Sequence, residues 1–430
     1  MGAVRVRLID PASAVRYEVT VDPVYAALWL VLACVLAFAF ELLLSPAKRT
    51  ARAALREKVE LLLSGVAHMA LSRDKSFKLS KQPDAQLLEL MTEPSQTKRV
   101  ILIRHGESLW NAVFNKSPML LMPLRLARAL VYEALVLLEL DSVLFDSPLS
   151  AEGRAQAREL ADFLARAHAK PSLAGGGAEQ ADIAALFDTT GSSVVVCSML
   201  RRAISTGVHA PMRGCGRSGA RARREPSTHL RPPPLPLNLA PSSTPPAPLV
   251  SPLSPPPRLG AGVRAAWLAL EERLRAAPPS QPMYLHSALQ EMSRNVDTLS
   301  IAPPRTMPPL SRVNGDAACV PDLSAHTSAR HHTGNKPVRA VALTRIGHFA
   351  EWLFARAEPC VVVVGHSLLF RTLFQLYLPR ASAHDAKAKK VVNCGVVGLT
   401  LHKGTLPDGR ISYRIDPQSV TVLYGGFGGK

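Results

Sequence analysis

The stretch "VILIRHGESLWN" at residues 100–111 joins a run of apolar residues to a cluster of charged and polar ones. A short aliphatic run without polar interruption is typical of a strand buried on both faces of a parallel sheet. The run ends at Arg104 and His105, where an ordinary turn would carry Asn, Asp, Ser or Gly. Because ligands of open α/β sheets bind beyond the carboxyl ends of the strands, this junction is the first candidate for a functional site.

The same pattern recurs further along the chain. Apolar runs at 192–197 and 360–367 predict two more buried strands, and segments at 151–168 and 368–378 have the spacing of helices. Alternating strands and helices indicate the α/β class, as a three-layer sandwich in which helices flank a largely parallel sheet. We expect this domain to span residues 98–430.

Charge and cysteine usage limit the classes of partner. The formal net charge is +18, and much of the excess lies in two short stretches at 45–60 and 211–231. Neither stretch interleaves aromatic with basic residues as single-strand binding platforms do, so no nucleic-acid partner is expected. The six cysteines form no Cys-x-x-Cys pair, which favours a reducing compartment over a disulfide framework or a zinc site.

Residues 24–44 form an apolar run of about the length that a helix needs to cross a bilayer. The run lacks a polar stripe, which disfavours a buried helix of the domain, and three acidic residues precede it, which disfavours a cleaved signal peptide. Basic residues from Lys48 to Lys58 follow, so the positive-inside rule predicts that the domain at 98–430 lies in the cytosol. We expect a tail at 1–23, a single transmembrane helix at 24–44 that binds a membrane of unknown identity, and a juxtamembrane tether at 45–97.

A segment at about 211–262 interrupts the domain. Twelve prolines lie between Pro232 and Pro257, and the upstream part is rich in Arg and Gly. Such a composition cannot build a packed core and predicts disorder. The motif "RPPPLP" at 231–236 fits a basic residue followed by PxxP, so an SH3-type partner is one hypothesis. The alternative is an inert insertion or a segment introduced by a faulty gene model.

Four segments place polar groups at or after strand ends: Arg104 with His105, Arg202, His366, and Glu291. If these strands are parallel neighbours, two histidines, two arginines and a carboxylate converge. A neutral imidazole can attack phosphorus, and guanidinium groups can hold phosphate oxygens. A carboxylic acid can protonate the leaving alkoxide and then act as a base toward water. We expect no metal and no other cofactor, because the cationic side chains occupy the electrostatic role of a metal.

These residues lie in segments that resemble the histidine phosphatase superfamily, in its phosphoglycerate mutase-like branch with the R-H-G-E motif. "RHGESLWN" at 104–111 matches R-H-G-E-x-x-x-N, and "DSPLSAEGRAQA" at 146–157 is similar to D-x-P-L-T-x-x-G-x-x-Q-A. "CSMLRRAIST" at 197–206 is similar to S-S-P-L-x-R-A-x-x-T, with Met199 in place of proline, and "VVVVGHSLLFR" at 361–371 resembles the G-H segment. The order of the segments also agrees, and the resemblance covers roughly 98–402.

The resemblance implies roles for individual residues. His105 would be the nucleophile, Glu291 the proton donor, and Glu107 would brace the loop. Three residues would form the phosphate pocket: Arg104, Arg202 and His366, the last also taking part in catalysis. Two further residues are candidate substrate contacts: Asn111 and Arg371.

We therefore expect a metal-independent phosphomonoester hydrolase, a histidine acid-type phosphatase that works through a phosphohistidine intermediate. Its substrate would be a phosphorylated small molecule or a phosphoprotein, and the sequence does not choose among sugar phosphates, phosphopeptides and lipid-soluble phosphates. A phosphoglycerate-type mutase is an alternative, disfavoured because the region after the signature is rich in leucine instead of matching mutase substrate loops. A membrane-tethered adaptor with an inactive phosphatase-like domain is another, disfavoured because an adaptor has no physical need for a cationic pocket.

Overall fold

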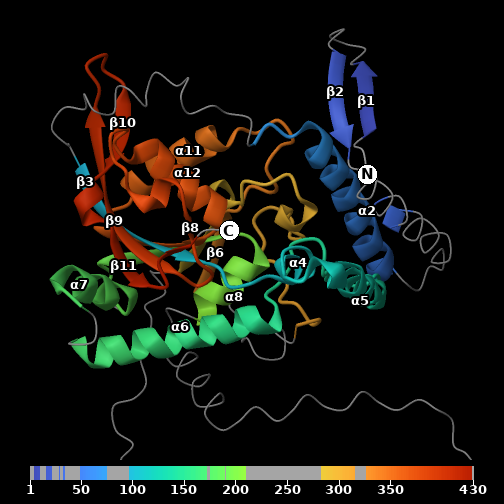
Figure 1. Ribbon diagram of the computed structural model, residues 1–430, viewed down its shortest axis with the longest axis horizontal. Helices are drawn as coiled ribbons and strands as arrows, with labels where there is room; N and C mark the ends of the chain where they lie inside the picture. Colours follow the sequence, from blue (N-terminus) through green and yellow to red (C-terminus); the bar gives the residue numbers. More distant parts are fainter. Residues whose placement is uncertain are drawn as a thin grey trace, which may run out of the picture.

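The structure is a computed structural model, and it describes residues 4–9, 16–21, 29, 32–33, 49–74, 96–171, 175–188, 190–209, 282–314 and 326–428. Within these residues the chain forms a mixed α/β domain whose central, mostly parallel sheet is flanked by helices (Figure 1). The predicted insertion at about 211–262 lies outside the described residues, so its disorder and its SH3-type partner stay predictions.

An eight-stranded sheet occupies the centre of the described domain, in the order β10-β9-β3-β7-β4-β5-β6 with β11 paired to β9. Five strands run parallel to one another: β3 (Gln96–Arg104), β7 (Cys360–Gly365), β4 (Ser193–Ser198), β5 (Met283–His286) and β6 (Thr327–His331). The others pair antiparallel: β9 (Val396–Thr405), β10 (Ile411–Ile415) and β11 (Thr421–Tyr424). The strand predicted from the opening stretch is β3, and it lies between β7 and β9.

The parallel register brings the predicted functional segments to one edge of the sheet. Arg104 at the end of β3 pairs with Gly365 at the end of β7, and Ser198 at the end of β4 pairs with His286 at the end of β5. The chain therefore leaves all four strands at the same edge, as the sequence analysis required.

Helices cover both faces of the sheet. Successive residues of β3 point to opposite faces, so Val100 and Leu102 belong to one apolar cluster and Ile101 and Ile103 to the other. The first cluster is covered by α11 (Ala342–Phe354) and α12 (Ser367–Tyr377). The second is covered by α6 (Ala151–Ala169), α7 (Gly177–Leu186) and α8 (Arg201–His209) (Figure 1). The predicted α/β class and the flanked, mostly parallel sheet are confirmed.

Shorter elements complete the described part. Two antiparallel pairs are β1 (Val4–Ile9) with β2 (Arg16–Val21) and β8 (Lys390–Val391) with β12 (Phe427–Gly428). Two helices follow β3: α4 (Leu109–Phe114) and α5 (Met122–Leu135). The 3-10 turns are η4 (Met119–Leu121), η7 (Ser287–Leu289), η8 (Val296–Thr298), η10 (Asp385–Lys387) and η11 (Pro417–Ser419).

Helix α2 (Arg49–Leu71) lies in the region for which a tether was predicted, and it packs on the domain. Leu55 and Leu62 are buried in one apolar cluster with Phe145. The buried Lys58 Nζ lies 3.2 Å from Glu133 Oε1 of α5. The apolar side of α2 thus finds cover on the domain surface, and these contacts hold residues 49–74 against it.

The predicted transmembrane helix at 24–44 lies outside the described residues except for Trp29, Leu32 and Ala33. Trp29 and Leu32 are buried in the cluster that contains Phe145. None of the helices that the structure describes is long and apolar enough to cross a membrane. The membrane anchor at 24–44 and the cytosolic placement of the domain stay predictions.

The loop after β3 is held against the start of α6. A Cβ added to Gly153 would lie 2.0 Å from the carbonyl oxygen of Glu107, so only glycine allows this approach. Ser150 Oγ accepts a hydrogen bond from the Gly153 amide at 2.9 Å and donates to Glu107 Oε2 at 2.7 Å. Glu107 therefore makes the kind of contact expected of a residue that braces the loop.

We expect Gly153→Ala to lower the free energy of unfolding by about 1–3 kcal/mol, because the added Cβ must displace backbone atoms of the loop. Chemical denaturation followed by fluorescence would measure the change. Gly347→Ala is the matched control, because a Cβ on Gly347 in α11 would meet nothing within 4 Å. The control should be neutral or slightly stabilising, since alanine is the better helix former. Equal effects of the two substitutions would contradict this description of the loop.

Candidate active site

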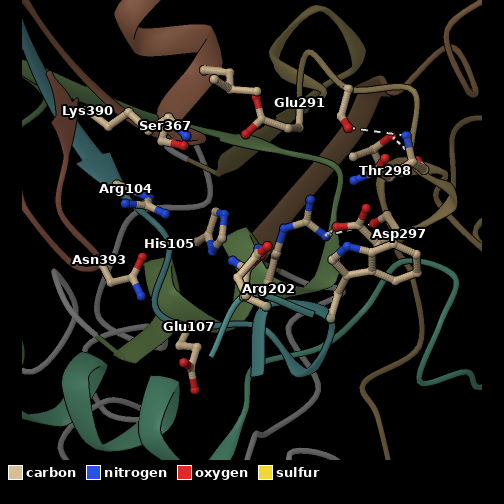
Figure 2. Close-up of a pocket in the computed structure, with 16 residues that line it drawn as sticks. Arg104, His105, Glu107, Arg202, Glu291, Asp297, Thr298, Ser367, Lys390 and Asn393 are labelled. Carbon is tan, nitrogen blue, oxygen red and sulfur yellow. Dashed lines mark hydrogen bonds and ion pairs between the residues drawn. The ribbon is translucent and has the colours of Figure 1, made fainter. Parts of the chain in front are cut away.

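A cavity of about 350 Å³ lies at the carboxyl edge of the parallel strands (Figure 2). Its walls come from the loop after β3, from α8, from the segment after β5 and from the start of α12. Five of the predicted site residues line it: Arg104, His105, Asn111, Arg202 and Glu291. Segments that lie far apart in the sequence thus meet at one cavity.

One ring nitrogen of His105 is hydrogen-bonded to the protein backbone. Its Nδ1 lies 2.6 Å from the Gly106 carbonyl oxygen, and a carbonyl only accepts, so Nδ1 carries the hydrogen. Burial, together with the guanidinium groups of Arg202 and Arg104, holds the pKa of His105 well below its usual value. The imidazole is therefore neutral near pH 7 and keeps a lone pair on Nε2.

Two guanidinium groups flank the His105 ring, that of the half-buried Arg104 and that of the buried Arg202 (Figure 2). Arg104 Nη1 donates to the Val391 carbonyl oxygen at 2.7 Å, and Arg202 Nη1 donates to the Asp297 carbonyl oxygen at 2.7 Å. The Nε atoms of both arginines are buried and have no partner among the described residues. Burial lowers the pKa of Arg104 to about 10, so it stays protonated at neutral pH. An anion bound in the cavity would satisfy these unpaired donors.

His366 is fully buried next to His105 and, like Arg371, is not among the residues that line the cavity. The two ring centroids are 5.0 Å apart, with an angle of 61° between the ring planes. Its Nε2 lies 2.8 Å from Ser198 Oγ, and its Nδ1 has no partner among the described residues. Burial, and after it Arg202, keeps the pKa of His366 well below its usual value. Arg371, one turn further along α12, does not line the cavity, so nothing in its placement favours the predicted substrate contact.

Two carboxyl groups lie near the arginines, and only one was anticipated. Glu291 Oε1 accepts from the amides of Met292 at 2.8 Å and Leu369 at 3.3 Å. Asp297 Oδ2 lies 3.4 Å from Arg202 Nη1, and its buried Oδ1 has no partner among the described residues. Burial raises the pKa of Asp297 to about 6. The site thus offers two candidates for a proton donor.

The adjacent arginines of "LRRA" have different tasks. Arg201 is buried, its Nη1 lies 2.5 Å from Asp141 Oδ1, and its Nε donates to the Asp146 carbonyl oxygen at 3.0 Å. Arg201 therefore ties the 146–157 segment to α8, whereas Arg202 lines the cavity. Of the two arginines only Arg202 lines the cavity, and its role in binding phosphate stays a prediction.

Lys336 supports the loop that carries Glu291. Its Nζ donates to the carbonyl oxygens of Glu291 at 2.6 Å and Ser293 at 2.7 Å, and it lies 2.7 Å from Asp74 Oδ2. Asp74 follows α2, so the N-terminal helix reaches the back of the site. Burial lowers the pKa of Lys336 to about 8. No local sequence pattern predicts the ion pair of Lys336 with Asp74, because the two residues are 262 positions apart.

Several lining residues were missed by the sequence analysis: Trp110, Asn115, Ser293, Asn295, Asp297, Thr298, Ser367, Leu368, Lys390 and Asn393. Ser367 and Leu368 follow His366 directly, so their adjacency to a predicted site residue was a usable signal. Lys390 and Asn393 lie in and after the short strand β8. The sequence there has no pattern that distinguishes it from an ordinary surface segment.

No family model and no curated protein matches the chain. Among solved structures, a mycobacterial glucosyl-3-phosphoglycerate phosphatase is 16% identical with a TM-score of 0.29, and the match covers 74% of this chain and 97% of that chain. A putative alpha-ribazole-5'-P phosphatase from Escherichia coli is 13% identical with a TM-score of 0.26, covering 78% of this chain and 100% of that chain. At such low scores these similarities support no conclusion about activity.

We expect nitrogen NMR of isotope-labelled histidines to show His105 as the neutral, Nδ1-protonated tautomer at about pH 6, below the ordinary histidine pKa of about 6.5. A lowered pKa means that the ring gains its second proton only in more acidic solution. His105→Asn would assign the resonance, and a histidine-containing peptide measured at the same pH would serve as the reference. An imidazolium signal from His105 at that pH would contradict the described electrostatics.

Proposed function

We propose that the protein is a phosphomonoester hydrolase of the histidine phosphatase superfamily that works through a phosphohistidine intermediate. The observation that supports this most is the neutral His105, whose Nδ1 is hydrogen-bonded to Gly106, between the guanidinium groups of Arg104 and Arg202. The segments that carry the sequence resemblance are those of the R-H-G-E motif, Arg202 and His366. Their meeting at one place in the structure supports the proposal.

In the proposed first step, the Nε2 lone pair of His105 attacks phosphorus. The N–P bond forms as the P–O bond to the leaving group breaks, and a carboxylic acid gives the leaving oxygen its proton. Arg104 and Arg202 hold the phosphate oxygens through their unpaired donors. His366 supplies a further donor when Nδ1 carries its hydrogen and Nε2 accepts from Ser198.

In the proposed second step, the carboxylate takes a proton from water, which attacks the phosphohistidine. The N–P bond breaks, inorganic phosphate leaves, and His105 returns to its neutral state. Fixed positive charge in a buried site stabilises the charge that develops on the phosphoryl oxygens, which is the main requirement of phosphoryl transfer. Glu291 is the proposed donor, because Asp297 is engaged with Arg202.

We expect His105→Ala to lower the hydrolysis of p-nitrophenyl phosphate by at least about 10³-fold, because the nucleophile is lost. The release of p-nitrophenolate measures the rate. His402→Ala, which removes a histidine of β9 outside the cavity, is the matched control and should keep its activity. Equal rates in wild type and His105→Ala would refute the nucleophile. Interconversion of phosphoglycerates faster than phosphate release would show that the protein acts as a mutase and not as a hydrolase.

The proton donor can be identified by varying the leaving group. An alkoxide needs a proton on leaving, whereas p-nitrophenolate leaves without one. Glu291→Gln should therefore lower kcat/KM for an alkyl phosphate by about 10²–10⁴-fold and affect p-nitrophenyl phosphate far less. Asp297→Asn should lower kcat/KM for both substrates by a similar factor, because it removes a partner of Arg202. If Asp297→Asn instead lowered kcat/KM selectively for the alkyl phosphate and Glu291→Gln did not, Asp297 would be the proton donor.

A further inference from the structure

A second cavity, of about 860 Å³, adjoins the first. The two share the lining residues Arg104, Asn115, Lys390 and Asn393. A group attached to a phosphate held at Arg104 can therefore extend into the second cavity. A cavity of this size accommodates a sizeable organic ligand, so its chemistry bears on the leaving group of the substrate.

The wall of the second cavity is partly apolar and partly cationic. Three apolar side chains line it, from Phe114, Met119 and Val392, beside the polar or cationic side chains of Arg104, Asn115, Gln156, Lys390 and Asn393. None of the described residues that line it is acidic, so it offers no partner for a cationic leaving group. The apolar part of the wall favours burial of CH₂ groups, and the cationic part favours an anionic head group.

An exposed apolar surface begins at the mouth of this cavity. Met119 lines the cavity, and the side chains that follow it are open to solvent: Leu120 is 88% exposed and Leu124 is 70% exposed. We call Met119, Leu120, Leu121 and Leu124 the apolar lip. Large contiguous apolar patches on a protein surface often mark an interaction site.

The lip is held in place and carries no negative charge. Arg125 donates to the carbonyl oxygens of Ala112 at 3.1 Å and Lys116 at 2.6 Å, which fixes the turn between α4 and η4. The only acidic residue in 117–138 is Glu133, which is buried and paired with Lys58 on the other side of α5. The lip therefore does not repel an anionic amphiphile.

We propose that the substrates are phosphomonoesters with an extended hydrocarbon tail. The phosphate lies between Arg104 and Arg202, the first part of the tail fills the second cavity, and the rest covers the apolar lip. The inference rests on the proposed function for the phosphate end, and on the continuity of cavity and lip for the tail. It selects the lipid-soluble class among the phosphorylated substrates that the sequence left open.

Binding of alkylphosphonates tests the tail separately from catalysis, because their C–P bond is not hydrolysed. Isothermal titration of the full chain with ethyl- to decylphosphonate, below the critical micelle concentration, should show affinity that rises about twofold for each CH₂ group whose surface is half covered. Leu120→Ser combined with Leu124→Ser should flatten this dependence for the longer homologues, whose tails reach past the second cavity onto the lip, with circular dichroism as the check on folding.

Leu135→Ser is the matched control. Leu135 is 74% exposed on the same helix, but it lies roughly 20 Å from the cavity mouth, beyond the reach of a decyl chain. The control should keep the full chain-length dependence and the rate of p-nitrophenyl phosphate hydrolysis.

An affinity that does not depend on chain length, or a dependence that the double variant keeps in full for the longest tails, would overturn the inference. Self-association lost in the double variant, without any chain-length effect, would also overturn it and assign the lip to a second copy of the chain. Hydrolysis of p-nitrophenyl phosphate would then still support the proposed function. A chain-length effect without any such hydrolysis would support the binding inference and count against the proposed function alone.

Discussion

Positive charge buried without a full set of partners is the constraint on which the site depends. Arg104 and Arg202 each place one donor on a backbone carbonyl and leave a buried Nε unpaired. A dianion between them would satisfy these donors and offset the cost of desolvating two cations. Burial, and with it these same charges, holds the pKa values of His105 and His366 down, so one arrangement both attracts phosphate and keeps the nucleophile neutral.

The fold supplies this arrangement through the register of its parallel strands. Because β3, β7, β4 and β5 end at one edge, the residues after them meet without long excursions of the chain. Contacts outside the sheet then fix the loops: Gly153 admits the loop after β3, and Lys336 holds the loop of Glu291. Lys336 in turn pairs with Asp74, so support of the site extends to the chain beyond α2.

The elements of the fold and the site residues that could be predicted are those that local sequence patterns indicate. Uninterrupted aliphatic runs identify β3 and β7, and strand ends followed by Arg or His identify His105 and His366. Asp297, Lys390 and the Asp74–Lys336 pair escaped prediction because their positions depend on contacts between distant segments. Arg371 shows the converse: helical spacing places it one turn from His366, yet it does not line the cavity. The segments at 24–44 and about 211–262 stay at the level of prediction.

The central claim is that His105 Nε2 takes the phosphoryl group, and detection of the phosphoenzyme tests it most directly. The protein would be mixed with an alkyl phosphate, quenched in alkali, which preserves phosphohistidine, and its peptides analysed by mass spectrometry and NMR. The account predicts an acid-labile phosphoryl group on Nε2 of His105, because Nδ1 is committed to Gly106. Turnover without any phosphorylated His105, or a phosphoryl group on Nδ1 or on another residue, would contradict it.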